Sequence, residues 1–258
     1  MSEQVSEAEE CPICKGARFV HPLLPSGQPD FTRVIPCQCA EREPEEERLS
    51  RLRRDSGDLE LELLSNMTFE NFDPRRVNLP LEQQQSLGDA YKLARRFAEE
   101  PEGWLVFQGP TGCGKTHLAA AIGNYQLKKG KPVFFKVVPD FLDHLRATFS
   151  PDSSVTYDEL FDRVKQAPLL ILDDFGKQAS TPWAQEKLYQ LVNYRYNARL
   201  PTVITSRLSL EDIELEISSR MIDPKVSTVF GIIAPDFRGD HTAAEMGKPQ
   251  AQRTRRRR

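Results

Sequence analysis

The segment Gly109–Thr116 reads GPTGCGKT and fits the phosphate-loop pattern G-x-x-x-x-G-K-[S/T]. Its glycines let backbone N–H groups point towards phosphate oxygens, and the N-terminus of the helix that follows adds a favourable dipole. We expect Lys115 to contact the β- and γ-phosphates and the Thr116 hydroxyl to bind Mg²⁺. The segment therefore predicts a site for ATP and Mg²⁺, with the binding residues Gly109, Pro110, Thr111, Gly112, Cys113, Gly114, Lys115, Thr116 and His117.

Two acidic residues at the end of an apolar run are expected to complete this site. The run LLILD at 169–173 predicts a buried strand, and parallel strands bring their carboxyl ends to one edge of a sheet. We predict that Asp173 holds Mg²⁺ through its waters and that Asp174 acts as a catalytic residue by polarising the attacking water. For Asp174 alone, capping of the next turn is an alternative role.

Phosphoryl transfer also needs groups that stabilise charge at the γ-phosphate. A polar group in Thr205-Ser206-Arg207, at the end of a predicted fourth strand, is one candidate, and we choose Ser206. Arg220 in the segment SSRMID is a candidate catalytic arginine that acts on the ATP of a neighbouring subunit. A surface salt bridge is the alternative role of Arg220.

Four of the five cysteines lie within the first forty residues, as the pairs CPIC and CQC. Two close pairs of thiolates can form a tetrahedral Zn²⁺ site, and a metal can fold a segment too short for a core. We therefore predict a structural zinc module with a docking role. His21 could replace one cysteine, although a surface role fits it better. The predicted zinc ligands are Cys11, Cys14, Cys37 and Cys39.

Beyond these cysteines the chain alternates apolar runs and helical patterns. Strands are predicted at 104–108, 132–137, 169–173, 201–206 and 227–233, and helices at 81–98, 115–129, 139–149, 182–199 and 210–222. Near-continuous apolar strands that alternate with helices are typical of a parallel sheet covered on both faces. The predicted organisation is a zinc module at 1–45, a charged helical linker at 46–66, an α/β ATPase domain at 67–239 and a basic disordered tail at 240–258.

Composition excludes some classes of protein. The net charge is −3 and 39% of residues are hydrophobic, which is enough for a core. No apolar run is long enough to predict a membrane span, and the acidic start MSEQVSEAEE does not look like a secretory signal, so we expect a cytoplasmic protein. The last residues read RTRRRR, which favours either a polyanion partner or a solubilising tail.

With these motifs assembled, the chain resembles the AAA+ ATPases of the DnaC/IstB group, and especially bacterial helicase loaders of the DnaC and DnaI type. The resemblance runs from about residue 69 to 238. It rests on the segments GPTGCGKTHLAAAIGN, VFFKVVPDFLDHLRATF, LLILDDFGKQ, NYRYNARLPTVITSR and SSRMID, and the cysteine module resembles one found before the ATPase in some loaders.

This resemblance implies a five-stranded parallel sheet in the order 5-1-4-3-2 and ATP-driven assembly of subunits into an open ring or spiral, with Arg220 completing the next subunit's site. It also implies loading or remodelling of a DnaB-like replicative helicase on single-stranded DNA. One position departs from the family. Its members usually carry Asn or Asp where this chain has Arg207, so either Ser206 or Thr205 takes over the sensor role, or hydrolysis is slow.

Two places have the cations and aromatic residues that single-stranded DNA binding needs. One follows the acidic pair, with Lys177, Thr181 and Trp183, and the other has Lys136, Arg146 and Phe149. Core packing of Phe149 and helix capping by Trp183 are alternatives.

Two other functions compete with helicase loading. They are an IstB-like transposition helper ATPase, and a nucleotide-gated binding module with little turnover.

Overall fold

The computed structural model describes residues 12–13, 19–20, 22, 28, 35–36, 59–150, 156–176 and 181–237. The chain divides into two compact units, Met1–Arg51 and Leu52–Arg258. In the first unit, the short strands β1 (Phe19–Val20) and β2 (Ile35–Pro36) pair antiparallel. The four predicted zinc cysteines, residues 46–58 of the predicted linker and the predicted tail lie outside the described residues.

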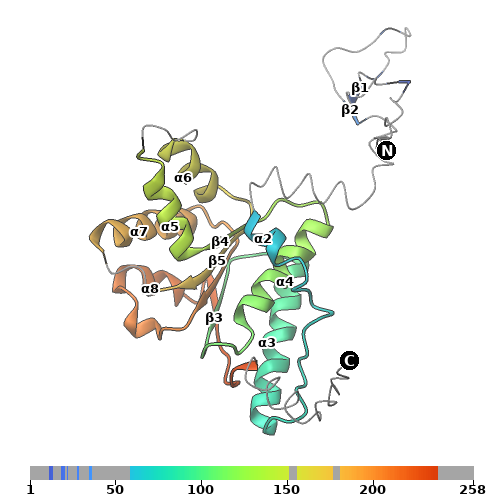
Figure 1. The fold of residues 1–258 in the computed structure, drawn as a ribbon, viewed down its shortest axis with the longest axis vertical. Coiled ribbons are helices and arrows are strands. Elements are labelled where there is room, and N and C mark those ends of the chain that lie inside the picture. The colour runs from blue at the N-terminus through green and yellow to red at the C-terminus, as the bar shows by residue number, and fades with distance from the viewer. Residues whose placement is uncertain are drawn as a thin grey trace, which may run out of the picture. The chain divides into compact units, whose positions relative to one another are not determined.

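The second unit is built on a five-stranded sheet. Its strands are β3 (Trp104–Gln108), β4 (Phe134–Val137), β5 (Leu170–Phe175), β6 (Thr202–Ser206) and β7 (Ser227–Gly231). They lie side by side in the order β4-β5-β6-β3-β7, and every pair is parallel. The predicted order is therefore confirmed, and β3, which leads into the phosphate loop, is the strand between β6 and β7 (Figure 1).

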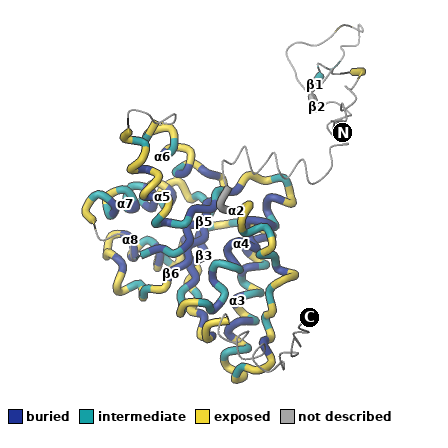
Figure 2. The backbone as a smooth tube through the Cα atoms, in the orientation of Figure 1, coloured by how far each residue is buried: buried dark blue, intermediate teal, exposed yellow. Residues whose placement is uncertain are grey.

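Helices cover both faces of this sheet (Figures 1 and 2). One face carries α2 (Leu59–Leu63), α3 (Leu81–Glu99) and α4 (Lys115–Lys128). The other face carries α5 (Val138–Ala147), α6 (Tyr157–Lys165), α7 (Pro182–Asn197) and α8 (Leu215–Met221). Because strands alternate their side chains, Trp104 and Val106 of β3 belong to the core beneath α7 and α8, and the buried Leu105 and Phe107 point to the opposite face.

A charged residue lies inside this core. Arg195 of α7 is fully buried, and its guanidinium donates to the carbonyls of Lys165, Ala167 and Pro201 and to Thr202 Oγ1, at 2.6–3.0 Å. Burial lowers the pKa of Arg195 to about 9, so the side chain stays cationic at neutral pH. Arg195 thus links the end of α6 to the starts of β5 and β6.

Two elements differ from the sequence-based prediction. The expected helix at 210–222 is divided into a 3₁₀ turn, η1 (Leu210–Asp212), and α8, because Ile213 takes an extended conformation with ψ 143°. Helix α6 was not predicted, although Thr156 and Glu159 form a capping box at its N-terminus.

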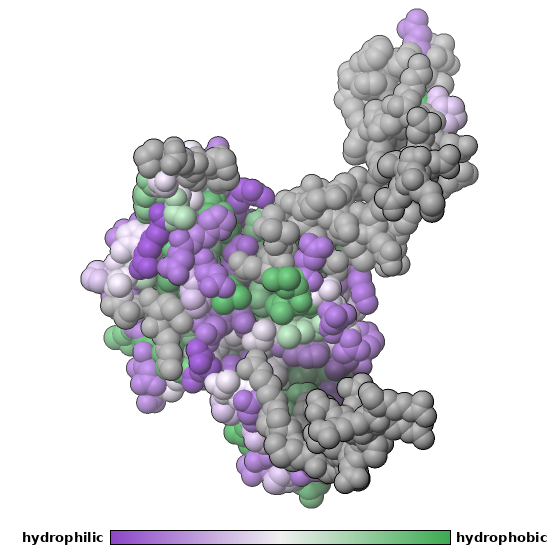
Figure 3. Space-filling view, viewed as in Figure 1, coloured by the Kyte–Doolittle hydropathy of each residue, from purple (hydrophilic) through white to green (hydrophobic). Residues whose placement is uncertain are grey.

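Polar residues dominate one face of the described part. On the face shown in Figure 3, hydrophilic residues cover most of the described area and hydrophobic residues form small areas between them. None of the helices in the described ranges is long and apolar enough to cross a membrane.

Candidate nucleotide-binding site

The phosphate loop connects β3 to α4 and depends on glycine backbone conformations. Gly112 has φ 74° and Gly114 has φ 106°, in the region that favours glycine. A Cβ atom at Gly112 would overlap the Asp236 carboxylate, and one at Gly114 would lie 2.9 Å from the Phe72 ring. Helix α4 begins at Lys115, so its N-terminus points into the loop, as anion binding requires.

Lys115 lies inside this loop. Its Nζ donates to the carbonyl oxygens of Gly109 at 2.8 Å and Pro110 at 2.7 Å, and lies 3.6 Å from Cys113 Sγ. Lys115 and Cys113 are both buried. Charged phosphate oxygens are stronger hydrogen-bond acceptors than these neutral carbonyls. The Lys115 ammonium group is therefore held where the oxygens of a bound phosphate would replace the two carbonyls.

Thr116 and Asp173, the predicted magnesium residues, are in direct contact. Thr116 Oγ1 lies 2.9 and 3.0 Å from the two carboxylate oxygens, and Thr205 Oγ1 donates to Asp173 Oδ1 at 2.6 Å. Burial raises the pKa of Asp173, against the lowering effect of the Thr205 and Thr116 hydrogen bonds. A hydroxyl beside a buried carboxylate is the hard oxygen donor set that Mg²⁺ prefers, so these residues fit the ion.

Asp174 lies beside this cluster in a left-handed backbone conformation, with φ 56°. Its N–H donates to Thr205 Oγ1 at 3.0 Å, at the irregularity in the pairing of β5 with β6. Its carboxylate accepts two hydrogen bonds from Arg207, from Nε at 2.7 Å and from Nη2 at 2.8 Å. The two predicted site acids are thus adjacent. Thr205 contacts both, through the Asp173 carboxylate and the Asp174 N–H, whereas Arg207 pairs with Asp174.

Ser206, the predicted sensor, makes a different set of contacts. It is fully buried, and its hydroxyl accepts from the Leu208 N–H at 3.0 Å and donates to the Leu208 carbonyl at 3.2 Å. Thr205 is the member of the triplet that reaches both acids. Alternation along β6 explains this difference, since adjacent side chains point to opposite faces.

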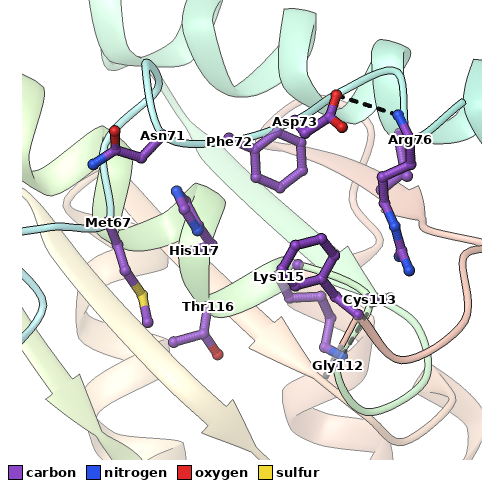
Figure 4. A pocket seen from close by; sticks show the side chains of 13 residues that line it. Met67, Asn71, Phe72, Asp73, Arg76, Gly112, Cys113, Lys115, Thr116 and His117 are labelled. Atoms are coloured by element: carbon purple, nitrogen blue, oxygen red, sulfur yellow. Dashed lines mark hydrogen bonds between the residues drawn. The ribbon is translucent and has the colours of Figure 1, made fainter. Parts of the chain in front are cut away.

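A cavity of about 200 Å³ opens beside the phosphate loop (Figure 4). The segment before α3 supplies much of its lining, and Phe237 comes from the end of the described chain. Phe72 meets the His117 ring edge-on at 5.2 Å, and Arg76 lies over the Phe237 ring at 4.9 Å. This largely apolar, aromatic lining suits a nucleobase. His117 was expected in the site from the phosphate-loop motif, whereas no local motif predicts the other lining residues, Met67, Asn71, Phe72, Asp73, Arg76, Leu87 and Phe237.

Arg220, the candidate catalytic arginine, lies on α8, on the other face of the sheet. Its guanidinium donates to Asn193 Oδ1 at 2.8 and 3.1 Å and to the Glu216 carbonyl, and it lies 5.0 Å from the Tyr189 ring centre. These contacts hold Arg220 against α7, whereas the phosphate loop leads into α4 on the opposite face.

Residues of the two predicted DNA-binding places are in contact with one another. Arg146 lies 5.0 Å from the Trp183 ring centre and 3.4 Å from Thr181 Oγ1, and Phe149 meets Trp183 edge-on at 6.4 Å. Phe149 is 62% exposed, so it is not a core residue. Thr181 caps α7. Lys136 is buried, which does not support its proposed DNA contact, and Lys177 lies outside the described residues.

A parallel sheet in this order, with a glycine-shaped phosphate loop after β3 and an acid at the end of β5, one strand beyond its neighbour β6, defines a P-loop ATP-binding protein of the AAA+ class. A protein-family model for IstB-like ATP-binding proteins matches residues 45–228, and the chain belongs to this family.

Similar proteins agree with this assignment. The replicative helicase loader DnaC of Buchnera aphidicola subsp. Schizaphis graminum is 30% identical over 162 residues, which are 63% of this chain and 64% of that protein. DnaC of Escherichia coli K12 is 29% identical over 164 residues, which are 62% of this chain and 63% of that protein. The chain thus spans just under two thirds of the length of these relatives.

Solved structures show the same fold. The crystal structure of the DnaC helicase loader superimposes with a TM-score of 0.54 and 24% identity, over 65% of this chain and 97% of that one. The DnaI crystal structure gives a TM-score of 0.52 and 23% identity, over 67% of this chain and 91% of that one.

Proposed function

We propose that this chain hydrolyses ATP and uses it to load or remodel a DnaB-like replicative helicase on single-stranded DNA. The contact of Thr116 with Asp173, beside Lys115, is the observation that carries the ATPase assignment. Lys115 would bind the β- and γ-phosphates, and Asp174 would accept a hydrogen bond from the attacking water. Mg²⁺ held by Thr116 and Asp173 would neutralise charge on the phosphate oxygens.

Lys115→Ala tests the nucleotide site. We expect this variant to lose measurable ATP binding in calorimetry, because the charge that faces the phosphates is gone. Lys92→Ala is the matched control, since Lys92 is an exposed lysine paired with Asp89 on α3. Normal ATP binding by Lys115→Ala would refute the site assignment.

Similarity to relatives named replicative helicase loader DnaC supports the choice of partner. Such a loader would act in the bacterial cytoplasm. The test is capture of the purified replicative helicase of the same organism by the full chain, with and without ATP. Capture that depends on ATP supports the loader, whereas capture of a transposase and no helicase supports the IstB-like alternative. Steady-state phosphate release near zero under all conditions would instead favour the nucleotide-gated binding module.

Assembly into a homo-oligomer would bring Arg220 to the ATP of the next subunit. Its fixed place on α8, held against Asn193 of α7 on the sheet face opposite α4, supports a role outside its own subunit's site. Mixing Lys115→Ala with Arg220→Ala subunits should restore hydrolysis that each variant lacks alone, because some interfaces then combine an intact loop with an intact arginine. No restoration in a mixture that still assembles would contradict the assignment.

The N-terminal cysteines would bind one Zn²⁺ as a structural module for docking a partner. Cys11, Cys14, Cys37 and Cys39 would supply four thiolates. Elemental analysis after mild purification should give about one zinc per chain, and Cys11→Ser should lower it. A zinc content near zero in the unmodified chain would remove the metal from the proposal.

A further inference from the structure

The ion pair between Asp174 and Arg207 involves the acid to which the proposed function assigns the attacking water. Nε and Nη2 of Arg207 each donate to a different carboxylate oxygen, at 2.7 and 2.8 Å. The Asp174 side chain is 32% exposed and the Arg207 side chain is 34% exposed. Bidentate pairing of this kind fixes the orientation of the carboxylate as well as its charge. In this arrangement both oxygens of Asp174 are directed at Arg207.

The backbone on both sides holds the pair in place. Asp174 has φ 56°, uncommon outside glycine, and its N–H is fixed by Thr205 Oγ1 at 3.0 Å. Arg207 lies between Ser206 and Leu208, whose own hydrogen bonds close a tight turn, and Gln108 Nε2 donates to the Leu208 carbonyl at 3.0 Å. The geometry of the pair is therefore built into the ends of β5 and β6.

The position of Arg207 also places it close to the phosphate loop. Gln108 is paired in register with Ser206, and Gly109, the first residue of the loop, follows Gln108. Arg207 follows Ser206 in the same way. A guanidinium group is suited to phosphate oxygens because it can donate two parallel hydrogen bonds to them. Asp174 and a bound γ-phosphate would thus compete for the same N–H donors of Arg207.

We propose that Arg207 is a positioning residue that keeps the Asp174 carboxylate turned towards its own guanidinium and not towards the attacking water, until Arg207 exchanges this carboxylate for a γ-phosphate oxygen of ATP. This inference rests on the proposed ATPase function. After the exchange, the water oxygen bonds to the γ-phosphorus while the bond from phosphorus to the β,γ-bridging oxygen breaks. That electron pair stays on ADP, and Asp174 takes the water proton and passes it to the released phosphate.

The exchange makes ATP affinity, but not ADP affinity, depend on Arg207. Arg207→Gln should weaken ATP binding about tenfold or more, because a hydrogen-bonded charge on the γ-phosphate is lost, and should leave ADP binding unchanged. Arg207→Lys keeps the charge but cannot donate two parallel hydrogen bonds, so its ATP affinity should lie between those of the wild type and Arg207→Gln. Both affinities are measured by calorimetry on the full chain, with thermal melts to check folding.

Asp174→Asn tests the other half of the exchange. The neutral amide of this variant cannot form an ion pair, so Arg207 is released in advance and ATP binding should tighten several-fold. In the Arg207→Gln background the same change should have no effect on ATP affinity. Two results would overturn the proposal. One is that Arg207→Gln has the same ratio of ATP affinity to ADP affinity as the wild type. The other is that Asp174→Asn raises ATP affinity by the same factor in the wild type and in Arg207→Gln. Loss of ATP binding in Lys115→Ala reports on the proposed ATPase site separately from these results.

Discussion

Thr205 offers a sharp test of how the two site acids are held. Its hydroxyl donates to Asp173 Oδ1 at 2.6 Å and accepts from the Asp174 N–H at 3.0 Å, and Thr205 is 1% exposed. Thr205→Val keeps the shape and removes both hydrogen bonds. A hydrogen bond to a charged group contributes about 1.5–3 kcal/mol, and an N–H left without an acceptor costs about 1–3 kcal/mol.

Allowing for the better burial of a methyl group, we expect a net loss of about 2–4 kcal/mol in the free energy of unfolding. That is a large share of the roughly 5–15 kcal/mol of a typical domain. Urea unfolding at neutral pH measures this loss. Thr205→Ser, which keeps the hydroxyl, is the control and should lose about 1 kcal/mol at most.

The same change should alter the pH dependence of magnesium use. The Thr205 hydrogen bond lowers the pKa of Asp173, so its loss raises this pKa further above the ordinary value. Mg²⁺ needs the ionised carboxylate, and the pH at which Mg²⁺-dependent hydrolysis begins should therefore move upwards in Thr205→Val. A variant with unchanged stability and an unchanged pH profile would refute the importance of these contacts.

Three further predictions concern the buried charges and the aromatic surface. Burial raises the pKa of Asp173 above its ordinary value, so its charge destabilises the fold. This cost is fully present above the raised pKa and falls to nothing as the pH drops from there to the ordinary value. Asp173→Asn should therefore raise the melting temperature of the nucleotide-free chain at neutral pH and lose this gain in acid. Arg195→Met should cost about 3–5 kcal/mol in urea unfolding, because it leaves buried carbonyls without donors. The exposed Arg199 is the control, and Arg199→Met should cost less than about 1 kcal/mol. Combined Phe149→Ala and Trp183→Ala changes should weaken single-stranded DNA binding about tenfold or more in fluorescence anisotropy, and unchanged affinity would exclude this surface.

The sequence predicted the sheet well because the inner strands β3, β5 and β6 are almost entirely buried, so their apolar runs are nearly continuous. The run at 104–108 matches β3 fully, and the predicted helix at 115–129 matches α4 to within one residue. Continuous apolar runs and the spacing of glycines are local features of the sequence, and the elements that they predict are present in the folded chain. The missed helix α6 also had a local signal, the Thr156–Glu159 capping box.

What the sequence could not predict are contacts between distant segments. Arg207 was noticed as a departure, but its partner Asp174 is 33 positions away and becomes visible only when β5 and β6 are paired. Arg195 lies in a predicted helix, and its burial depends on carbonyls from two other places in the chain, residues 165–167 and Pro201. The cavity beside the phosphate loop combines the segment before α3 with Phe237, at the far end of the domain.

The place of β3 between β6 and β7 has a consequence for how the chain folds during synthesis. The strand that carries the phosphate loop pairs with β6 and β7, both of which leave the ribosome much later. Pairings between segments far apart in sequence form slowly. ATP therefore cannot guide early folding, because its loop is not fixed until the last strand arrives. A chain cut before Ser227 would leave one edge of β3 unpaired, and we expect such a fragment to aggregate instead of forming a smaller ATP-binding protein.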